Sequence, residues 1–183
     1  MKSVLMSAVV LAFAGTVAAQ SGFDGVWLRD DRRSDDAEEK VDAAVTGLIE
    51  KVSRGRRTRE EVDSQVVKQL RGIVDTFVQY ADEIDIELDG EELYVQDSWD
   101  RLRIFYLDGM THKRQMPNGT SLETIATRTG NRIEIEAKTS DKSEIFETYI
   151  LSGDGTELSL AVRLEDKQLK QPLVINNIYV LEP

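Results

Sequence analysis

The chain has 183 residues, of which 31% are charged and 40% hydrophobic, and its formal net charge is −11. An acidic excess of this size repels phosphate backbones, so we expect no nucleic acid partner. The sequence contains no cysteine and a single histidine, which excludes the usual zinc clusters and the cysteine–histidine nucleophile pairs. We therefore predict no metal, no cofactor, no catalytic residues and a protein that is not an enzyme.

The first nineteen residues have the pattern of a secretory signal peptide. Lys2 gives a basic start, an apolar run covers residues 4–17, and small residues precede Gln20. The run is shorter than the roughly twenty apolar residues of a membrane-spanning helix, and no later segment approaches that length. We predict cleavage after Ala19, a periplasmic or secreted bacterial protein without a membrane span, and a single domain over residues 20–183.

Two helical patterns follow a short first strand. Asp35, with a glutamate three residues later, precedes apolar residues that recur at three- and four-residue steps over 41–52. Thr58, also with a glutamate three residues later, opens a second such pattern over 62–81. Together they predict a helical hairpin over about residues 35–81. Its apolar stripes must pack against a sheet, because no other large partner is available.

From Ile84 onward the sequence is a series of short alternating segments, and turn signals recur about every eight to twelve residues. A two-residue turn joins neighbouring antiparallel strands. With a first strand over 23–30, we predict a mainly β protein: an antiparallel lipocalin-like barrel of about ten strands, with the helical hairpin inserted between strands 1 and 2. The turn signals are Asp89-Gly90, Asp108-Gly109, Asn118-Gly119, Gly130-Asn131, Asp141-Lys142 and Gly153-Asp154-Gly155.

Gly25-Val26-Trp27, at the start of the first strand, resembles the G-x-W opening of the lipocalins and of lipocalin-like bacterial proteins. The resemblance implies that the glycine lets the chain bend into the barrel and that the tryptophan closes the barrel floor. The chain also resembles a group of secreted bacterial proteins of unknown function, which implies the same fold and an export route but no particular ligand. The residues that match this group are Trp27, Leu28, Arg29, Arg33, Ser34, Asp35 and Asp36.

The leading hypothesis is non-catalytic binding of a small apolar or amphipathic ligand inside the barrel. Strand pleating points alternate side chains inward, where an apolar lining suits such a ligand. The same side chains would also line a filled core, so the sequence leaves both readings open. The candidate ligand-binding residues are Ile86, Val95, Ile104, Ile135 and Leu160.

The alternative is a periplasmic protein-interaction module, such as an inhibitor or an envelope-assembly factor, with a filled barrel. Its candidate partner-binding residue is Trp99, which lies in a hairpin loop that needs no large aromatic residue for its turn. Trp99 equally suits a position folded back onto the helical hairpin.

Three further features have plain structural explanations beside a functional one. His112 suits a solvated strand end as well as chemistry. Two carboxylates facing each other across the barrel mouth would suit glycoside hydrolysis, but most acidic residues alternate with apolar neighbours and so belong to solvated strand faces. Four arginines between the helices suit an anionic ligand, or the carbonyl end of the first helix and its acidic neighbours. They are Arg54, Arg56, Arg57 and Arg59.

Overall fold

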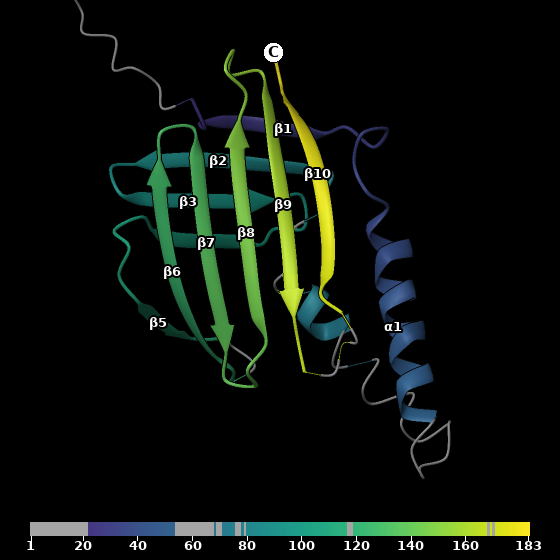
Figure 1. The fold of residues 1–183 in the computed structure, drawn as a ribbon. Coiled ribbons are helices and arrows are strands. Elements are labelled where there is room, and N and C mark those ends of the chain that lie inside the picture. The colour runs from purple at the N-terminus through teal and green to yellow at the C-terminus, as the bar shows by residue number, and fades with distance from the viewer. Residues whose placement is uncertain are drawn as a thin grey trace, which may run out of the picture.

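The computed structural model describes residues 22–53, 68, 71–75, 78, 80–116, 119–167, 169 and 171–183. Ten strands make up most of this part of the chain, and helix α1 lies between the first two strands (Figure 1). The predicted signal peptide lies outside the described residues. The bounds are β1 Gly25–Arg29, α1 Ala37–Ser53, β2 Glu83–Asp89, β3 Glu92–Asp97, β4 Leu102–Tyr106, β5 His112–Gln115, β6 Ser121–Thr129, β7 Arg132–Thr139, β8 Glu144–Leu151, β9 Glu157–Glu165 and β10 Leu173–Leu181.

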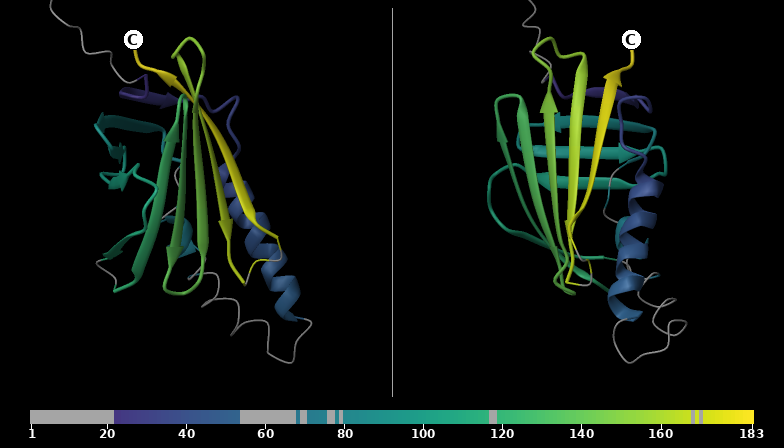
Figure 2. Two further views of the ribbon diagram at one scale, coloured as in Figure 1. Left: turned by 60° about the vertical axis from the view of Figure 1, so that its left-hand side comes forward. Right: turned by 45° about the vertical axis from the view of Figure 1, so that its right-hand side comes forward.

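The strands pair antiparallel in the order β4-β3-β2-β1-β10-β9-β8-β7-β6-β5. They form two layers whose strands cross, with β1 to β4 behind β6 to β10 in Figure 1, and Figure 2 shows the two layers from further sides. The layers are continuous where β1 pairs with β10. This topology confirms the predicted antiparallel barrel of ten strands with a helical insertion between strands 1 and 2.

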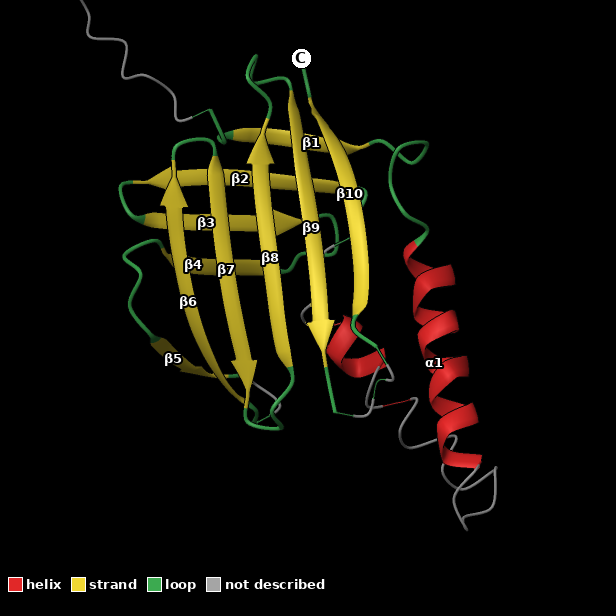
Figure 3. Ribbon diagram, viewed as in Figure 1, coloured by secondary structure: helices red, strands yellow, loops and turns green. Residues whose placement is uncertain are grey.

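The first arm of the predicted helical hairpin is α1, which runs beside β10 (Figure 3). Most of the second arm lies outside the described residues, although residues 68 and 71–75 within it are helical. In the described part of the chain, neither helical stretch combines the length and the apolarity that a membrane crossing requires.

The barrel is nearly closed, and its seam lies between β4 and β5, which occupy the two ends of the strand order. The Asp108-Gly109 turn was expected to join two paired strands. Instead Asp108 forms an isolated bridge with Thr127 of β6, and the Gly109 amide donates to the Ala126 carbonyl (3.0 Å). The Asp108 carboxylate accepts a hydrogen bond from the Met110 amide (2.8 Å), a local turn that directs the chain toward β6 rather than back along β4.

The G-x-W opening has a packing role at the beginning of β1. Trp27 is fully buried, and its indole Nε1 donates a hydrogen bond to the Phe23 carbonyl (2.9 Å). Gly25 has φ +137°, and a Cβ atom there would lie 2.7 Å from Cδ1 of Leu181 on β10. The backbone conformation therefore favours glycine at this position, and a Cβ there would also displace the Leu181 side chain.

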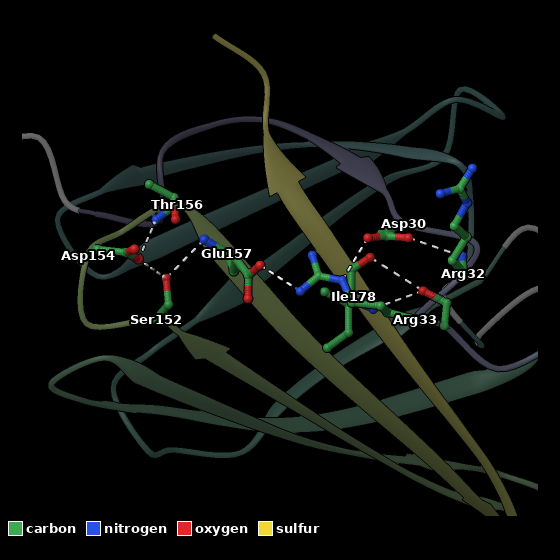
Figure 4. Close-up of polar contacts among 9 residues, drawn as sticks. Asp30, Arg32, Arg33, Ser152, Asp154, Thr156, Glu157 and Ile178 are labelled. Atoms are coloured by element: carbon green, nitrogen blue, oxygen red, sulfur yellow. Dashed lines mark hydrogen bonds and ion pairs between the residues drawn. The ribbon is translucent and has the colours of Figure 1, made fainter.

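The charged segment after β1 continues the pairing along β10 (Figure 4). The Asp30 amide donates to the Ile178 carbonyl (2.8 Å), and the Ile178 amide donates to the Ser34 hydroxyl (3.0 Å). The Arg33 guanidinium donates to Asp30 (2.7 Å) and to Glu157 of β9 (2.6 Å). Residues 30–34, which lie between β1 and α1, thus supply hydrogen-bond partners to the backbone of β10 beyond the end of β1.

Candidate functional site

The inward faces of the strands form one apolar cluster between the two layers. Four of the five predicted lining residues belong to it, and each is at most 2% exposed: Ile86 on β2, Val95 on β3, Ile135 on β7 and Leu160 on β9. The structure therefore gathers side chains from both layers around the interior, as the strand alternation predicted.

Ile104, the fifth, lies on the outer face of β4 instead. It pairs with the half-buried Tyr94, whereas its neighbour Arg103 pairs with the buried Val95. Directly opposite residues of an antiparallel pair share a face, so β4 directs Arg103 and Phe105 inward. The prediction that Ile104 lines the interior is therefore wrong. Because β4 carries apolar residues on both faces, periodicity alone does not show which face is inward.

Arg103 forms a buried polar cluster with two residues of the opposite layer. Its Nη1 donates to Oε1 of Glu147 on β8 (2.5 Å), and its Nη2 donates to the Tyr149 hydroxyl (3.0 Å). That hydroxyl donates in turn to Oε2 of Glu147 (2.7 Å). Because β4 and β8 lie in different layers (Figure 1), the cluster spans the interior.

Burial and charge act in opposite directions on this cluster. Burial disfavours the charged form of Arg103, but Glu147 and Tyr149 outweigh it, so the pKa of the guanidinium is raised. Burial, followed by the charge of Glu147, also holds the pKa of the Tyr149 hydroxyl well above its usual value. The hydroxyl therefore stays protonated at neutral pH and donates a hydrogen bond to Glu147.

A second guanidinium lies nearby at the seam. Arg114 is a half-buried residue of β5 and pairs with the buried Leu122 of β6, which places it on the inward face. Burial, with the repulsion of Arg103 as the second cause, lowers the pKa of Arg114. Within the described residues, the Nε atoms of both Arg103 and Arg114 are buried and have no hydrogen-bond partner.

This arrangement places donors that lack acceptors, within the described residues, beside a buried apolar core. Guanidinium groups only donate hydrogen bonds, so the missing partner is an oxygen atom or an anion. The Glu147 carboxylate has both oxygens engaged. The described residues hold no cluster of three or more histidine, aspartate or glutamate side chains suited to a metal ion. The cluster is therefore suited to binding the polar end of a ligand.

These four polar residues were not predicted. Glu147 and Tyr149 share the inward face of β8 with Ile145 and Leu151, so a charge at an otherwise apolar alternating position is the signal that would have found Glu147. For Arg103 and Arg114 no such signal exists, since β4 is apolar on both faces and β5 is polar on both.

His112 begins β5 and is partly buried, in contrast to a fully solvated strand end. Its Nε2 lies 2.9 Å from Oδ2 of Asp108, and its ring stacks on Tyr106 at a centroid distance of 4.5 Å. These contacts hold the start of β5 against Tyr106, the last residue of β4, at the seam. The four arginines of the predicted inter-helix loop lie outside the described residues.

Trp99 is 46% exposed in the β3–β4 turn. One side of its ring meets Tyr80 edge-on at a centroid distance of 5.0 Å, and the Arg101 guanidinium lies 4.5 Å from the ring centroid. The ring packs on the segment preceding β2, within the range of the predicted helical hairpin, and still presents a surface to solvent. Its role in binding a partner stays a prediction.

A surface cleft of about 440 Å³ lies between α1 and the start of β10. Ala43, Ala44 and Val174 contribute to its lining, with Lys40 at the same cleft. It contains none of the predicted ligand-binding residues and none of the interior polar cluster.

No protein family model and no curated protein matches this sequence. Solved structures do match the fold. Lipid binding protein 8 of Caenorhabditis elegans superposes with a TM-score of 0.51 at 14% identity, over 90% of this chain and 100% of that one. Secretory abundant heat soluble protein 4 of Ramazzottius varieornatus gives 0.50 at 14% identity, over 89% and 96%. Fatty-acid-binding protein 1 of Echinococcus granulosus gives 0.48 at 15% identity, over 88% and 98%.

Proposed function

We propose that this protein binds a small amphipathic molecule inside its barrel and catalyses no reaction. The apolar part of the ligand would lie against Ile86, Ile135 and Leu160, and its polar end would accept hydrogen bonds from Arg103 and Arg114. The single observation that carries this proposal is the pair of buried Nε atoms that lack an acceptor among the described residues, beside an otherwise apolar core.

A filled core would not explain these groups. Leaving a buried donor without a partner costs about 1–3 kcal/mol, and more when the group is charged. A hydrophobic residue in place of Arg114, or hydrophobic residues in place of both Arg103 and Glu147, would remove that cost, because buried ion pairs replaced by well-packed apolar residues are often as stable or more stable. The cost is offset if a ligand supplies the acceptor.

The structural likeness supports the same proposal at the level of the fold. The name of the Caenorhabditis elegans protein describes lipid binding, and we propose that this chain uses the same kind of barrel for a ligand of that class. We further propose that it acts after export to the periplasm or outside the cell, which rests on the basic, apolar and small-residue pattern of residues 1–19.

Two measurements test the binding proposal. Native mass spectrometry of the purified protein, followed by organic extraction, is expected to reveal a bound lipid-like mass. Titration with a dansyl-labelled fatty acid is expected to give saturable fluorescence enhancement, as the probe enters an apolar site. A bare protein that also fails to bind the dansyl probe would overturn the proposal.

A matched pair of variants locates the site. Ile135→Phe adds bulk to the inward face of β7, whereas Ile125→Phe adds the same bulk to the exposed outer face of the adjacent β6. We expect the first to weaken probe binding and the second to leave it unchanged. Equal affinities in two variants with native unfolding midpoints would place the probe elsewhere.

A further inference from the structure

The charges around the proposed ligand position do not cancel. Arg103 and Arg114 are two positive groups on inward faces, and Glu147 is the one negative group bonded to Arg103. The Glu147 carboxylate accepts from a guanidinium on one oxygen and from a tyrosine hydroxyl on the other, which is the bonding pattern of an ionised carboxylate. The cluster therefore carries one excess positive charge.

Asp97 and Arg29 are two further inward charges, and each belongs to a separate network. Asp97 pairs with Arg101 (2.7 Å) and also accepts from two backbone amides of the β3–β4 turn. Arg29 donates to Asn177 (3.0 Å) and pairs with Asp31. Neither side chain has a hydrogen bond or ion pair to the cluster among the contacts of the described residues, so neither neutralises its excess charge directly.

The donors that remain point to where an anion would be held. Glu147 already occupies Nη1 of Arg103, and Tyr149 occupies Nη2. Only 7% of Arg103 is exposed, and its Nε has no partner within the described residues. The Arg114 side chain is half-buried, and its Nε is likewise buried and without a partner there. An anion can therefore accept a hydrogen bond from Nε of Arg103 without displacing Glu147, and Arg114 offers a second such donor on the inward face of β5.

We propose that Glu147 is a specificity-determining residue that sets the charge of the ligand's polar end at minus one. This inference rests on the proposed function. With Glu147 ionised, a monoanion leaves the enclosed cluster neutral, a dianion leaves an uncompensated negative charge, and an uncharged head leaves the positive charge uncompensated. An unbalanced charge in a poorly solvated interior is strongly disfavoured, so the monoanion binds best.

The test compares three probes of equal chain length at pH 8: dodecanol, dodecanoate and dodecyl phosphate, the last being mainly a dianion at this pH. Wild-type protein is expected to bind dodecanoate most tightly. Glu147→Gln keeps the length of the side chain and removes its charge, which leaves two excess positive charges. We expect the affinity for dodecyl phosphate, relative to dodecanoate, to rise at least about tenfold.

Glu144→Gln is the matched control, because Glu144 lies on the same strand but pairs with Lys138 on the outer face. It should keep the wild-type ratio. Arg114→Met removes the excess positive charge and should shift the preference toward dodecanol. If Glu147→Gln does not fold, this second variant tests whether the net charge of the cluster sets the preferred charge of the ligand. Ratios equal to wild type in the folded variants overturn the role of Glu147, whereas wild-type protein that binds none of the three probes overturns the proposed function itself.

Discussion

The Tyr179 hydroxyl donates a hydrogen bond to the backbone carbonyl of Ala81 (2.9 Å), joining the last strand to a segment 98 residues earlier. Both groups are buried, so Tyr179→Phe would leave the carbonyl without its donor. We expect this variant to lower the free energy of unfolding by about 1–3 kcal/mol, measured by urea titration. Tyr106→Phe, at an exposed position, should change it by less than about 0.5 kcal/mol. Equal losses in the two variants would contradict the role of the bond.

The pair formed by Arg103 and Glu147 predicts a characteristic non-additivity. Removing either partner leaves the other charge buried, so Arg103→Met and Glu147→Met should each cost about 3–5 kcal/mol in free energy of unfolding. The double variant has no unpaired charge in this pair, and its loss should be well below the sum of the two single losses. A double-mutant cycle in guanidinium chloride measures the coupling, and a sum that is simply additive would argue against the pair.

Two glycines should respond to alanine in opposite directions. Gly25→Ala places a methyl group against Leu181 at a positive φ, and we expect a loss of about 1–3 kcal/mol from strain. Gly72 lies in the helical stretch 71–75, where an added Cβ meets no atom within 4 Å. Gly72→Ala should therefore add about 0.5–1 kcal/mol of helix stability. Thermal unfolding of both variants distinguishes these outcomes from a uniform effect.

Asp35 gives the protein a pH dependence. Burial acts to raise the pKa of its carboxyl, but hydrogen bonds from Asn176, supported by Lys40, outweigh burial and lower the pKa in the folded protein. A lowered pKa contributes stability above the unfolded value, and that contribution is lost as pH falls through the folded value. The stability difference between wild type and Asp35→Asn should therefore be full at pH 7 and shrink between about pH 4 and pH 2. A difference that does not change across this range would rule out the linkage.

The architecture was largely predictable because hairpin spacing and alternation are local signals. The turns at Gly90 and Gly130 have positive φ, as two-residue hairpin turns require. The seam was not predictable. Asp108-Gly109 has the same local sequence as a hairpin turn, and its contacts with Ala126 and Thr127 arise only once β6 is in place.

The interior was predictable only where each strand has one apolar face. Ile86, Ile135 and Leu160 follow from alternation, and the structure buries all three. The position of Ile104 does not follow from alternation, because the pairing between β3 and β4 decides which face of β4 is inward. The contact between Arg103 and Glu147 joins strands of opposite layers, and nothing in either local sequence indicates the other.

The place of β1 between β2 and β10 bears on how the molecule is made. During translation β1 is synthesised before the other nine strands and β10 after them. The edge of β1 that pairs with β10 therefore stays unpaired through almost the whole of translation. Long-range pairing of this kind slows folding, and the unpaired backbone groups of a strand edge can form hydrogen bonds with other chains. Nascent chains halted before residue 173 should therefore recruit chaperones or aggregate, whereas chains released after residue 181 should not.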